Sequence, residues 1–120
     1  SWGMRHKILI WTLQTENSVF QESLAHFLEE GGELFIALNA QDAEAIVNRE
    51  KPQLIFIDHR SLQAFSKGSV KESHCYVICE KGTQAPNGYL TLERPLTQKK
   101  IADCCKAVFT DEIFVKIPPM

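Results

Sequence analysis

The chain has 120 residues, of which 44% are hydrophobic and 23% are charged, values close to the average for folded soluble domains. This length fits one domain with one core. The formal net charge is −2 and the longest basic run is the pair Lys99 and Lys100, which disfavours direct nucleic-acid binding. The apolar runs are far shorter than the roughly 20 residues that span a bilayer, and no secretory leader precedes the first predicted strand, so we expect a cytoplasmic protein without a membrane span.

Apolar strands alternate with amphipathic helices in the first half of the chain. Residues 7–11 form a nearly continuous apolar run, as expected for a strand covered by helices on both faces, which favours a parallel sheet. A helix should follow, capped by Asn17 or Ser18 and ended by Gly31 and Gly32. Its apolar stripe consists of Phe20, Leu24, Phe27 and Leu28. A second strand is predicted over residues 33–38, and a second helix over residues 39–49 carries Ala43, Ile46 and Val47.

The second half continues this pattern with fewer helices. Residues 54–57 form the strongest predicted strand, which ends in the polar cluster Asp58, His59 and Arg60, at the edge where parallel sheets place their sites. A weak helical stretch around Leu62, Phe65 and Val70 leads to a strand over residues 75–79. Residues 81–88 have turn chemistry, which predicts a loop in place of a crossover helix. A fifth strand over residues 89–92 precedes a last helix, capped by Thr97 and carrying Ile101, Cys104, Cys105 and Val108 on one face.

These elements predict one α/β domain. Five strands alternating with about four helices fit a doubly wound, five-stranded parallel sheet whose fourth helix is missing or shortened. We assign residues 4–110 to this domain and residues 1–3 to a remnant left by cloning. Residues 111–120 are expected to be a C-terminal tail or the start of a linker to a further domain.

The order and spacing of the elements over roughly residues 5–109 resemble the receiver domain of two-component response regulators, which has a flavodoxin-like topology. In that family an aspartate at the end of the third strand accepts a phosphoryl group, and Asp58 falls at the matching position. The family holds Mg²⁺ with an acidic pair after the first strand, ends the fourth strand in Ser or Thr, and follows the fifth strand with a Lys-Pro pair. The resemblance also implies a cis bond between Arg94 and Pro95, which X-Pro sequences permit at low cost.

The sequence keeps the aspartate of this pattern and alters the other functional groups. The degenerate pocket consists of Thr12 and Leu13 in place of the acidic pair, Cys79 in place of Ser or Thr, and Arg94 in place of lysine ahead of Pro95. Thr91 stands where the family has an aromatic switch residue. Mg²⁺ requires hard oxygen ligands, and the residues after the first strand offer no carboxylate at the family's position. We therefore expect no cofactor and doubt that magnesium binds.

Four polar positions near this edge carry further expectations. Asp58 is either a residual phosphorylation or anion-sensing site, or a strand-end residue that caps local backbone. Arg94 is either a permanent partner of Asp58, substituting for ion and lysine, or a solvated arginine. Glu16 lies two to four residues beyond the family's acidic position, so we expect it not to rescue the metal site. His59 is assigned no catalytic role, because no nucleophile stands in a fixed relation to it.

The four cysteines, Cys75, Cys79, Cys104 and Cys105, match no zinc or redox spacing and are predicted to be reduced core residues. One member of the adjacent pair should face the core, and the pair is not expected to form a disulfide or to act as a redox sensor.

These observations predict a non-enzymatic pseudo-receiver, a signal-transduction domain of a two-component or transcriptional regulator that is not phosphorylated and acts through protein–protein interaction. Its partners would be other domains of the same regulator or a sensor kinase, and the resemblance implies a homodimer as a further expectation. Two alternatives stay open. One is a genuine phosphoacceptor that uses Asp58 with a degenerate magnesium site. The other is a small flavodoxin-like enzyme or ligand-binding domain, disfavoured because no glycine lies between Thr12 and Glu16 to cradle a phosphate.

Overall fold

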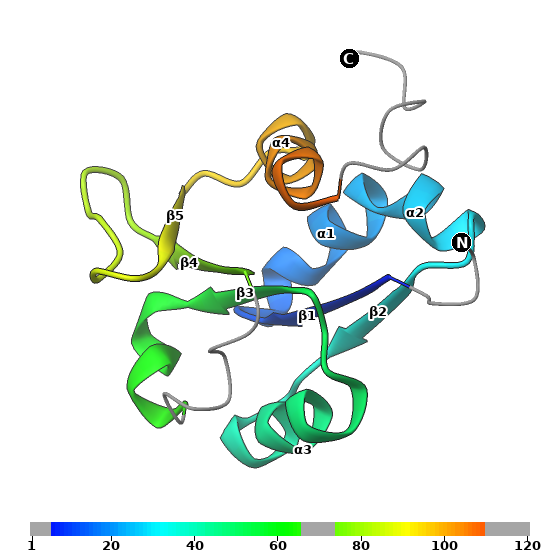
Figure 1. Cartoon of the computed structure of the whole chain (residues 1–120). Helices are drawn as coiled ribbons and strands as arrows, with labels where there is room; N and C mark the ends of the chain where they lie inside the picture. The colour runs from blue at the N-terminus through cyan, green and yellow to red at the C-terminus, as the bar shows by residue number, and fades with distance from the viewer. Residues whose placement is uncertain (1–5, 66–73, 110–120) are drawn as a thin grey trace.

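The computed structural model describes residues 6–65 and 74–109 of the chain. Within them, five strands form one parallel sheet in the order β2-β1-β3-β4-β5, with helices on both faces (Figure 1). The strands are β1 (Lys7–Trp11), β2 (Glu33–Ile36), β3 (Leu54–Asp58), β4 (His74–Cys79) and β5 (Leu90–Glu93). The helices are η1 (Gln14–Glu16), α1 (Asn17–Ser23), α2 (Ala25–Glu29), α3 (Ala40–Glu50), η2 (His59–Ala64) and α4 (Gln98–Val108). The predicted doubly wound sheet is therefore confirmed.

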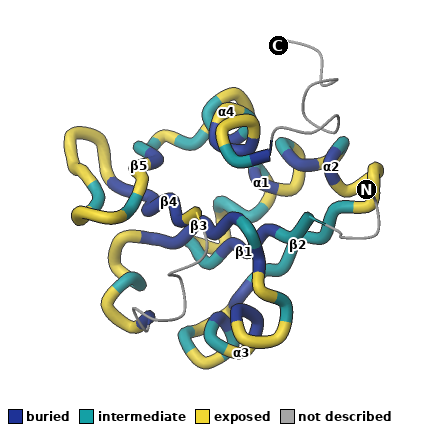
Figure 2. The backbone as a smooth tube through the Cα atoms, in the orientation of Figure 1, coloured by how far each residue is buried: buried dark blue, intermediate teal, exposed yellow. Residues whose placement is uncertain are grey.

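The sheet divides the core into two layers because successive strand residues point to opposite faces. In β1, Ile8 and Ile10 pack toward α1, α2 and α4, whereas Leu9 packs toward α3 and η2. All five residues of β3 are buried, which explains why the central strands are continuous apolar runs (Figure 2). None of the helices in residues 6–65 and 74–109 has both the length and the apolar character needed to cross a bilayer.

The first predicted helix differs from expectation at its start and in its middle. The 3₁₀ turn η1 precedes it, and the backbone N–H of Asn17 donates to the Gln14 carbonyl, so neither Asn17 nor Ser18 caps the helix with its side chain. The helix divides into α1 and α2 at Leu24, and Leu28 is 38% exposed rather than part of the core. The other predicted stripe residues, including Phe20 and Leu24, are buried.

Later elements follow the predictions with small changes in their limits. The second strand ends at Ile36, and Leu38 is 81% exposed because it lies beyond the last strand pairing. Asn39 caps α3 by accepting a hydrogen bond from the Asp42 backbone, and Thr97 caps α4 in the same manner. The part of the predicted weak helix that includes Val70, together with residues 1–3 and 111–120, lies outside the described residues.

Residues 80–89 form the predicted loop in place of a crossover helix. Two hydrogen bonds to β5 hold it: the backbone N–H of Ala85 donates to Thr91 Oγ1 at 2.9 Å, and that of Gly82 donates to Glu93 Oε2 at 3.2 Å. Ala85 and Tyr89 pack against the α3 layer. Thr91, which the resemblance places where receiver domains have an aromatic residue, therefore fixes the loop.

Candidate functional site

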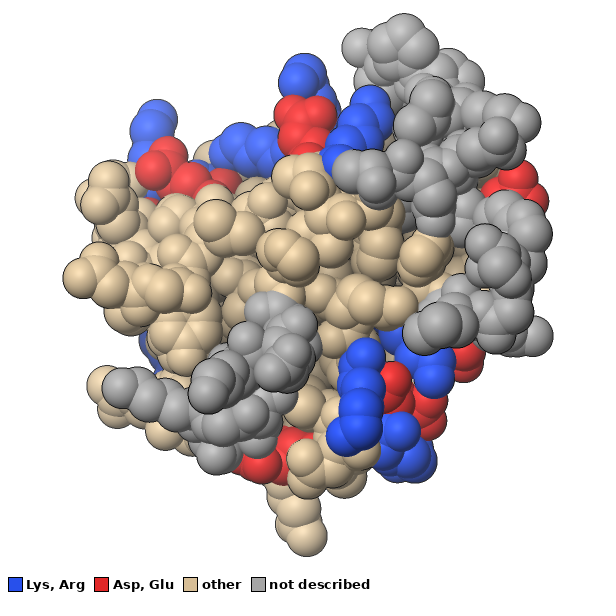
Figure 3. Space-filling model, in the orientation of Figure 1, with Lys and Arg blue, Asp and Glu red and all other residues tan. Residues whose placement is uncertain are grey.

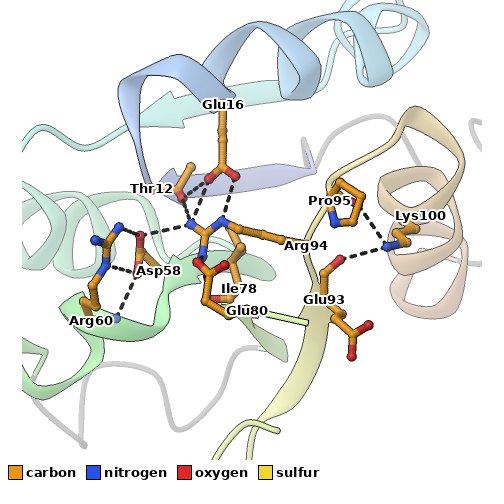
Figure 4. A network of polar contacts seen from close by, with 10 residues as sticks. All are labelled: Thr12, Glu16, Asp58, Arg60, Ile78, Glu80, Glu93, Arg94, Pro95 and Lys100. Atoms are coloured by element: carbon orange, nitrogen blue, oxygen red, sulfur yellow. Dashed lines mark hydrogen bonds and ion pairs between the residues drawn. The ribbon is translucent and has the colours of Figure 1, made fainter. Parts of the chain in front are cut away.

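Polar side chains gather at the carboxyl edge of the sheet, where the ends of parallel strands meet (Figure 4). Asp58 is the last residue of β3, and Arg94 directly follows β5. Thr12 follows β1, and Glu16 ends the turn η1. Three segments that are distant in the sequence, residues 12–16, Asp58 and Arg94, thus contribute to one network.

Arg94 lies at the centre of the network. Its Nε donates to Glu16 Oε2 at 2.8 Å, and its Nη2 donates to Glu16 Oε1 at 3.0 Å and to Asp58 Oδ2 at 3.1 Å. Its Nη1 forms a further ion pair with the exposed Glu80 at 3.2 Å. The Arg94 side chain is only 12% exposed, so the prediction of a pair with Asp58 is confirmed and the solvated alternative is wrong. The hydrogen bonds that Arg94 donates to Glu16 raise the pKa of Arg94, which keeps it cationic.

Asp58 accepts hydrogen bonds on both carboxylate oxygens. Oδ1 accepts from the backbone N–H of Arg60 at 2.9 Å and from its Nε at 3.3 Å, and Oδ2 accepts from Arg60 Nη2 at 3.0 Å as well as from Arg94. The residue therefore caps η2 and also forms two ion pairs. Burial acts to raise the pKa of Asp58, but the hydrogen bonds from Arg60 and Arg94 outweigh it and lower that pKa below its usual value.

Glu16 takes part in the network, although it lies beyond the position at which the resemblance places the acidic pair. The turn η1, closed by a hydrogen bond from the Glu16 backbone to the Leu13 carbonyl, brings its side chain back toward the strand ends. There it accepts from Thr12 Oγ1 at 2.7 Å in addition to Arg94. Both carboxylate oxygens of Glu16 are thus occupied by the guanidinium of Arg94.

The turn after β5 is fixed by a lysine of α4. Lys100 Nζ donates to the backbone carbonyls of Glu93 and Pro95, each at 2.9 Å (Figure 4). The peptide bond between Arg94 and Pro95 is cis, as the resemblance to receiver domains implied. These contacts hold the backbone on both sides of Arg94.

Several sequence-predicted positions lie outside these side-chain contacts. Leu13 is 40% exposed, and Cys79 is buried in the α3 layer, where its Sγ donates to the Val77 carbonyl. Burial raises the pKa of the Cys79 thiol. His59 is exposed at the start of η2.

The cysteines are free and buried, which confirms the core interpretation. Both Cys104 and Cys105 are buried, in agreement with the predicted apolar face of α4. Cys105 packs among the α1 and α4 residues, and Cys104 packs beside Tyr76 of β4.

A groove of about 560 Å³ opens on the solvent side of Arg94. It combines apolar and charged side chains: Thr15, Glu16, Val19, Glu80, Lys81, Arg94, Pro95 and Leu96. Glu16 and Arg94 of the network therefore border the groove directly.

No protein-family model and no curated protein matches this chain. Solved structures do. CheY4, a chemotaxis response regulator of Vibrio cholerae, has a TM-score of 0.65 at 14% identity, covering 88% of this chain and 100% of that one. The signal receiver domain of a LuxO repressor protein from Vibrio parahaemolyticus has a TM-score of 0.66 at 18% identity, covering 87% and 89%.

The fold is that of receiver domains. NtrX from Brucella abortus, solved in complex with ADP, has a TM-score of 0.64 at 19% identity. The match covers 88% of this chain but 26% of NtrX, so the chain corresponds to about a quarter of that regulator. The receiver fold thus occurs both as a nearly whole chain, as in CheY4, and as one part of a larger protein.

The site does not fit the Mg²⁺ that receiver domains bind beside their aspartate. Arg94 Nη2 lies within 3.1 Å of carboxylate oxygens of both Glu16 and Asp58, where an ion would have to contact them. Mg²⁺ needs near-octahedral oxygen coordination at about 2.0–2.1 Å, and a guanidinium in this place repels it. Among residues 6–65 and 74–109, no three His, Cys, Asp or Glu side chains are grouped so that they could hold a metal ion.

Proposed function

We propose that this chain is a pseudo-receiver, a signalling domain that regulates or docks a partner through protein–protein contacts without being phosphorylated. The observation that carries the proposal is the position of the Arg94 guanidinium between Asp58 and Glu16. A fixed cation there replaces both the metal ion and the lysine of the family. The site is therefore held in one state whether or not a phosphodonor is present.

The chemistry of phosphoryl transfer supports this proposal. A carboxylate must offer an unoccupied lone pair in line with the phosphorus, and a divalent ion neutralises the charge that accumulates. Both oxygens of Asp58 already accept hydrogen bonds from Arg60 and Arg94. The lowered pKa of Asp58 also reduces its basicity, and with it its nucleophilic strength.

The proposal is tested by incubating the chain with Mg²⁺ and a small phosphodonor and measuring its intact mass. We expect no gain of one phosphoryl group, about 80 Da, on the wild-type chain. A receiver domain that accepts a phosphoryl group from the same donor, treated in parallel, serves as a positive control for the donor. A gain that Asp58→Asn abolishes overturns the proposal.

That outcome would support the genuine phosphoacceptor, the second candidate. One observation favours it: Asp58 ends β3 at the carboxyl edge, and the Arg60 side chain that covers it is 68% exposed and so is free to turn away. Arg94 would have to move as well, and it is held by Glu16 and by the fixed turn after β5.

The proposed partners are other domains of the same regulator or a sensor kinase, with a homodimer as a further candidate. The surface agrees with protein rather than nucleic-acid partners, since Lys and Arg lie next to Asp and Glu on the face shown in Figure 3. Lys99 pairs with Asp103 at 2.9 Å on α4, and Lys7 pairs with Glu50 at 3.0 Å. A nucleic-acid surface would instead present basic side chains of one sign.

A further inference from the structure

The loop between β4 and β5 presents an asparagine that is followed directly by a glycine. Asn87 and Gly88 are both exposed, and the loop that carries them extends from the sheet at the left of Figures 1 and 2. The chain has three other asparagines, Asn17, Asn39 and Asn48, and the residue after each of them carries a side chain. Asn87 therefore differs from the others in its neighbour, and the fold adds further differences.

Neither the Asn87 side-chain amide nor the Gly88 backbone N–H makes a hydrogen bond with the rest of the described chain. The turn is closed beside them, where the Tyr89 N–H donates to the Pro86 carbonyl at 3.1 Å. Gly88 has a φ of +92°, and a Cβ built on it would meet no atom within 4 Å, so the bond is surrounded by open space. A glycine backbone also rotates with less hindrance than that of other residues. The Gly88 nitrogen can therefore approach the side-chain carbonyl carbon of Asn87 without losing a hydrogen bond of its own.

The other asparagines are held by helices. Asn48 lies inside α3, where the N–H of the next residue points along the helix axis to a carbonyl four residues back. Asn39 caps α3, and its Oδ1 accepts from the Asp42 backbone at 2.8 Å. Asn17 is the first residue of α1. In these three places the helix fixes the backbone and keeps the following nitrogen away from the asparagine side chain.

We propose that Asn87 is a site of spontaneous deamidation, at which the folded chain acquires an isoaspartate or an aspartate without an enzyme. The Gly88 nitrogen attacks the side-chain carbonyl carbon of Asn87, a C–N bond forms, and the side-chain amide leaves as ammonia with the proton of the Gly88 N–H. The attack is intramolecular, which lowers the entropic part of its barrier. Water then opens the cyclic imide. Addition at the side-chain carbonyl gives aspartate, and addition at the main-chain carbonyl gives isoaspartate.

The products change the loop that leads into β5. Isoaspartate routes the main chain through the side-chain carbon, which adds one methylene between Pro86 and Tyr89 and disrupts the hydrogen bond that closes the turn. Either product also adds one negative charge to the loop. The chain on both sides of the turn is fixed, by the bond from Ala85 to Thr91 and by the packing of Tyr89 against the α3 layer. The change should therefore stay within the loop and leave the sheet in place.

The test is to age the folded chain in warm, mildly alkaline buffer and to map its peptides by mass spectrometry over time. The peptide that contains Asn87 should gain the mass of water less that of ammonia, and an isoaspartate-specific methyltransferase should then label it. We expect this conversion to be at least about tenfold faster than that at Asn48, the factor that about 1.4 kcal/mol of barrier provides. Asn87→Gln is the matched control, and it should show no conversion at this position because its imide ring would be one atom larger.

A second measurement, on the chain unfolded in urea, separates the effect of the fold from that of the sequence. Because the fold leaves both reacting groups free, Asn87 should convert at a similar rate in the folded and the unfolded chain. A folded rate more than about tenfold below the unfolded one, or no higher than the rate at Asn48, overturns the inference.

Gly88→Ala tests the part played by the glycine. It is compared with the wild type in urea, because its positive φ would strain a side chain in the folded loop. The substitution should slow the conversion of Asn87, and equal rates in the two unfolded chains also count against the inference. The proposed function does not depend on any of these outcomes, since it concerns whether the wild-type chain gains a phosphoryl group.

Discussion

Replacing Glu16 with glutamine removes the charge that holds Arg94 most closely. Both carboxylate oxygens of Glu16 accept from the guanidinium, at 2.8 and 3.0 Å, and the two side chains are 16% and 12% exposed. Glutamine keeps the shape and one acceptor oxygen. It loses the negative charge, and it turns an NH₂ group toward the donors of Arg94.

The expected loss follows from these contacts. A hydrogen bond to a charged group contributes roughly 1.5–3 kcal/mol, and breaking a fully buried ion pair costs about 3–5 kcal/mol. The pair is partly accessible, and Arg94 keeps its bonds to Asp58 and Glu80, so the loss lies toward the lower values. We expect Glu16→Gln to lower the free energy of unfolding by about 1.5–2.5 kcal/mol.

Urea unfolding at neutral pH, followed by circular dichroism, measures this difference. Glu29→Gln is the control, because Glu29 is an exposed glutamate on α2, and its effect should stay within about 0.5 kcal/mol. If Glu16→Gln lowers the free energy of unfolding by no more than the control does, the ion pair contributes nothing to stability. The interpretation that Glu16 holds Arg94 in place is then wrong.

Three further predictions concern other parts of the chain. Because the pKa of Asp58 is lowered in the folded state, its contribution to stability is complete above its ordinary pKa of 3.8 and is lost as the pH falls toward the folded value; acid titration of Asp58→Asn should lack this component. Burial raises the pKa of Cys75 to about 12 and that of Cys104 to about 11, so an aromatic disulfide reagent at pH 8 should label the cysteines only after denaturation, and rapid native labelling would contradict their burial. A Cβ at Gly32 would overlap the buried ring of Phe27, so Gly32→Ala should destabilise by about 1–3 kcal/mol, and an unchanged urea midpoint would show that the ring moves aside freely.

The strands could be predicted because a strand that is buried on both faces must be a continuous run of apolar residues. Every residue of β3 is buried, and only a continuous apolar run satisfies that condition. The division of the first helix at Leu24 could not be predicted, because Phe20, Leu24 and Phe27 keep the spacing of one continuous helix. The exposure of Leu38 was also not predictable, since hydrophobicity extends beyond the last strand pairing.

The site was predictable where its residues end strands. Asp58 and Arg94 follow the apolar cores of β3 and β5, and topology alone places them at one edge. The ion pair of Glu16 with Arg94 was not predicted, because a 3₁₀ turn redirects the chain after β1, and such a short turn has no periodic signal. Arg60 stood in the predicted polar cluster, but its bond to Asp58 depends on side-chain geometry that spacing does not reveal.

The strand order has a consequence for how this chain assembles during synthesis. After β3, each new strand joins the outer edge of the one made before it, so β4 and then β5 extend the sheet in the order in which they are translated. Arg94 directly follows β5 and is the last member of its network to emerge. A nascent chain that ends before Arg94 therefore carries Glu16 without its counter-charge and Asp58 with only the exposed Arg60 beside it, until residue 94 is added.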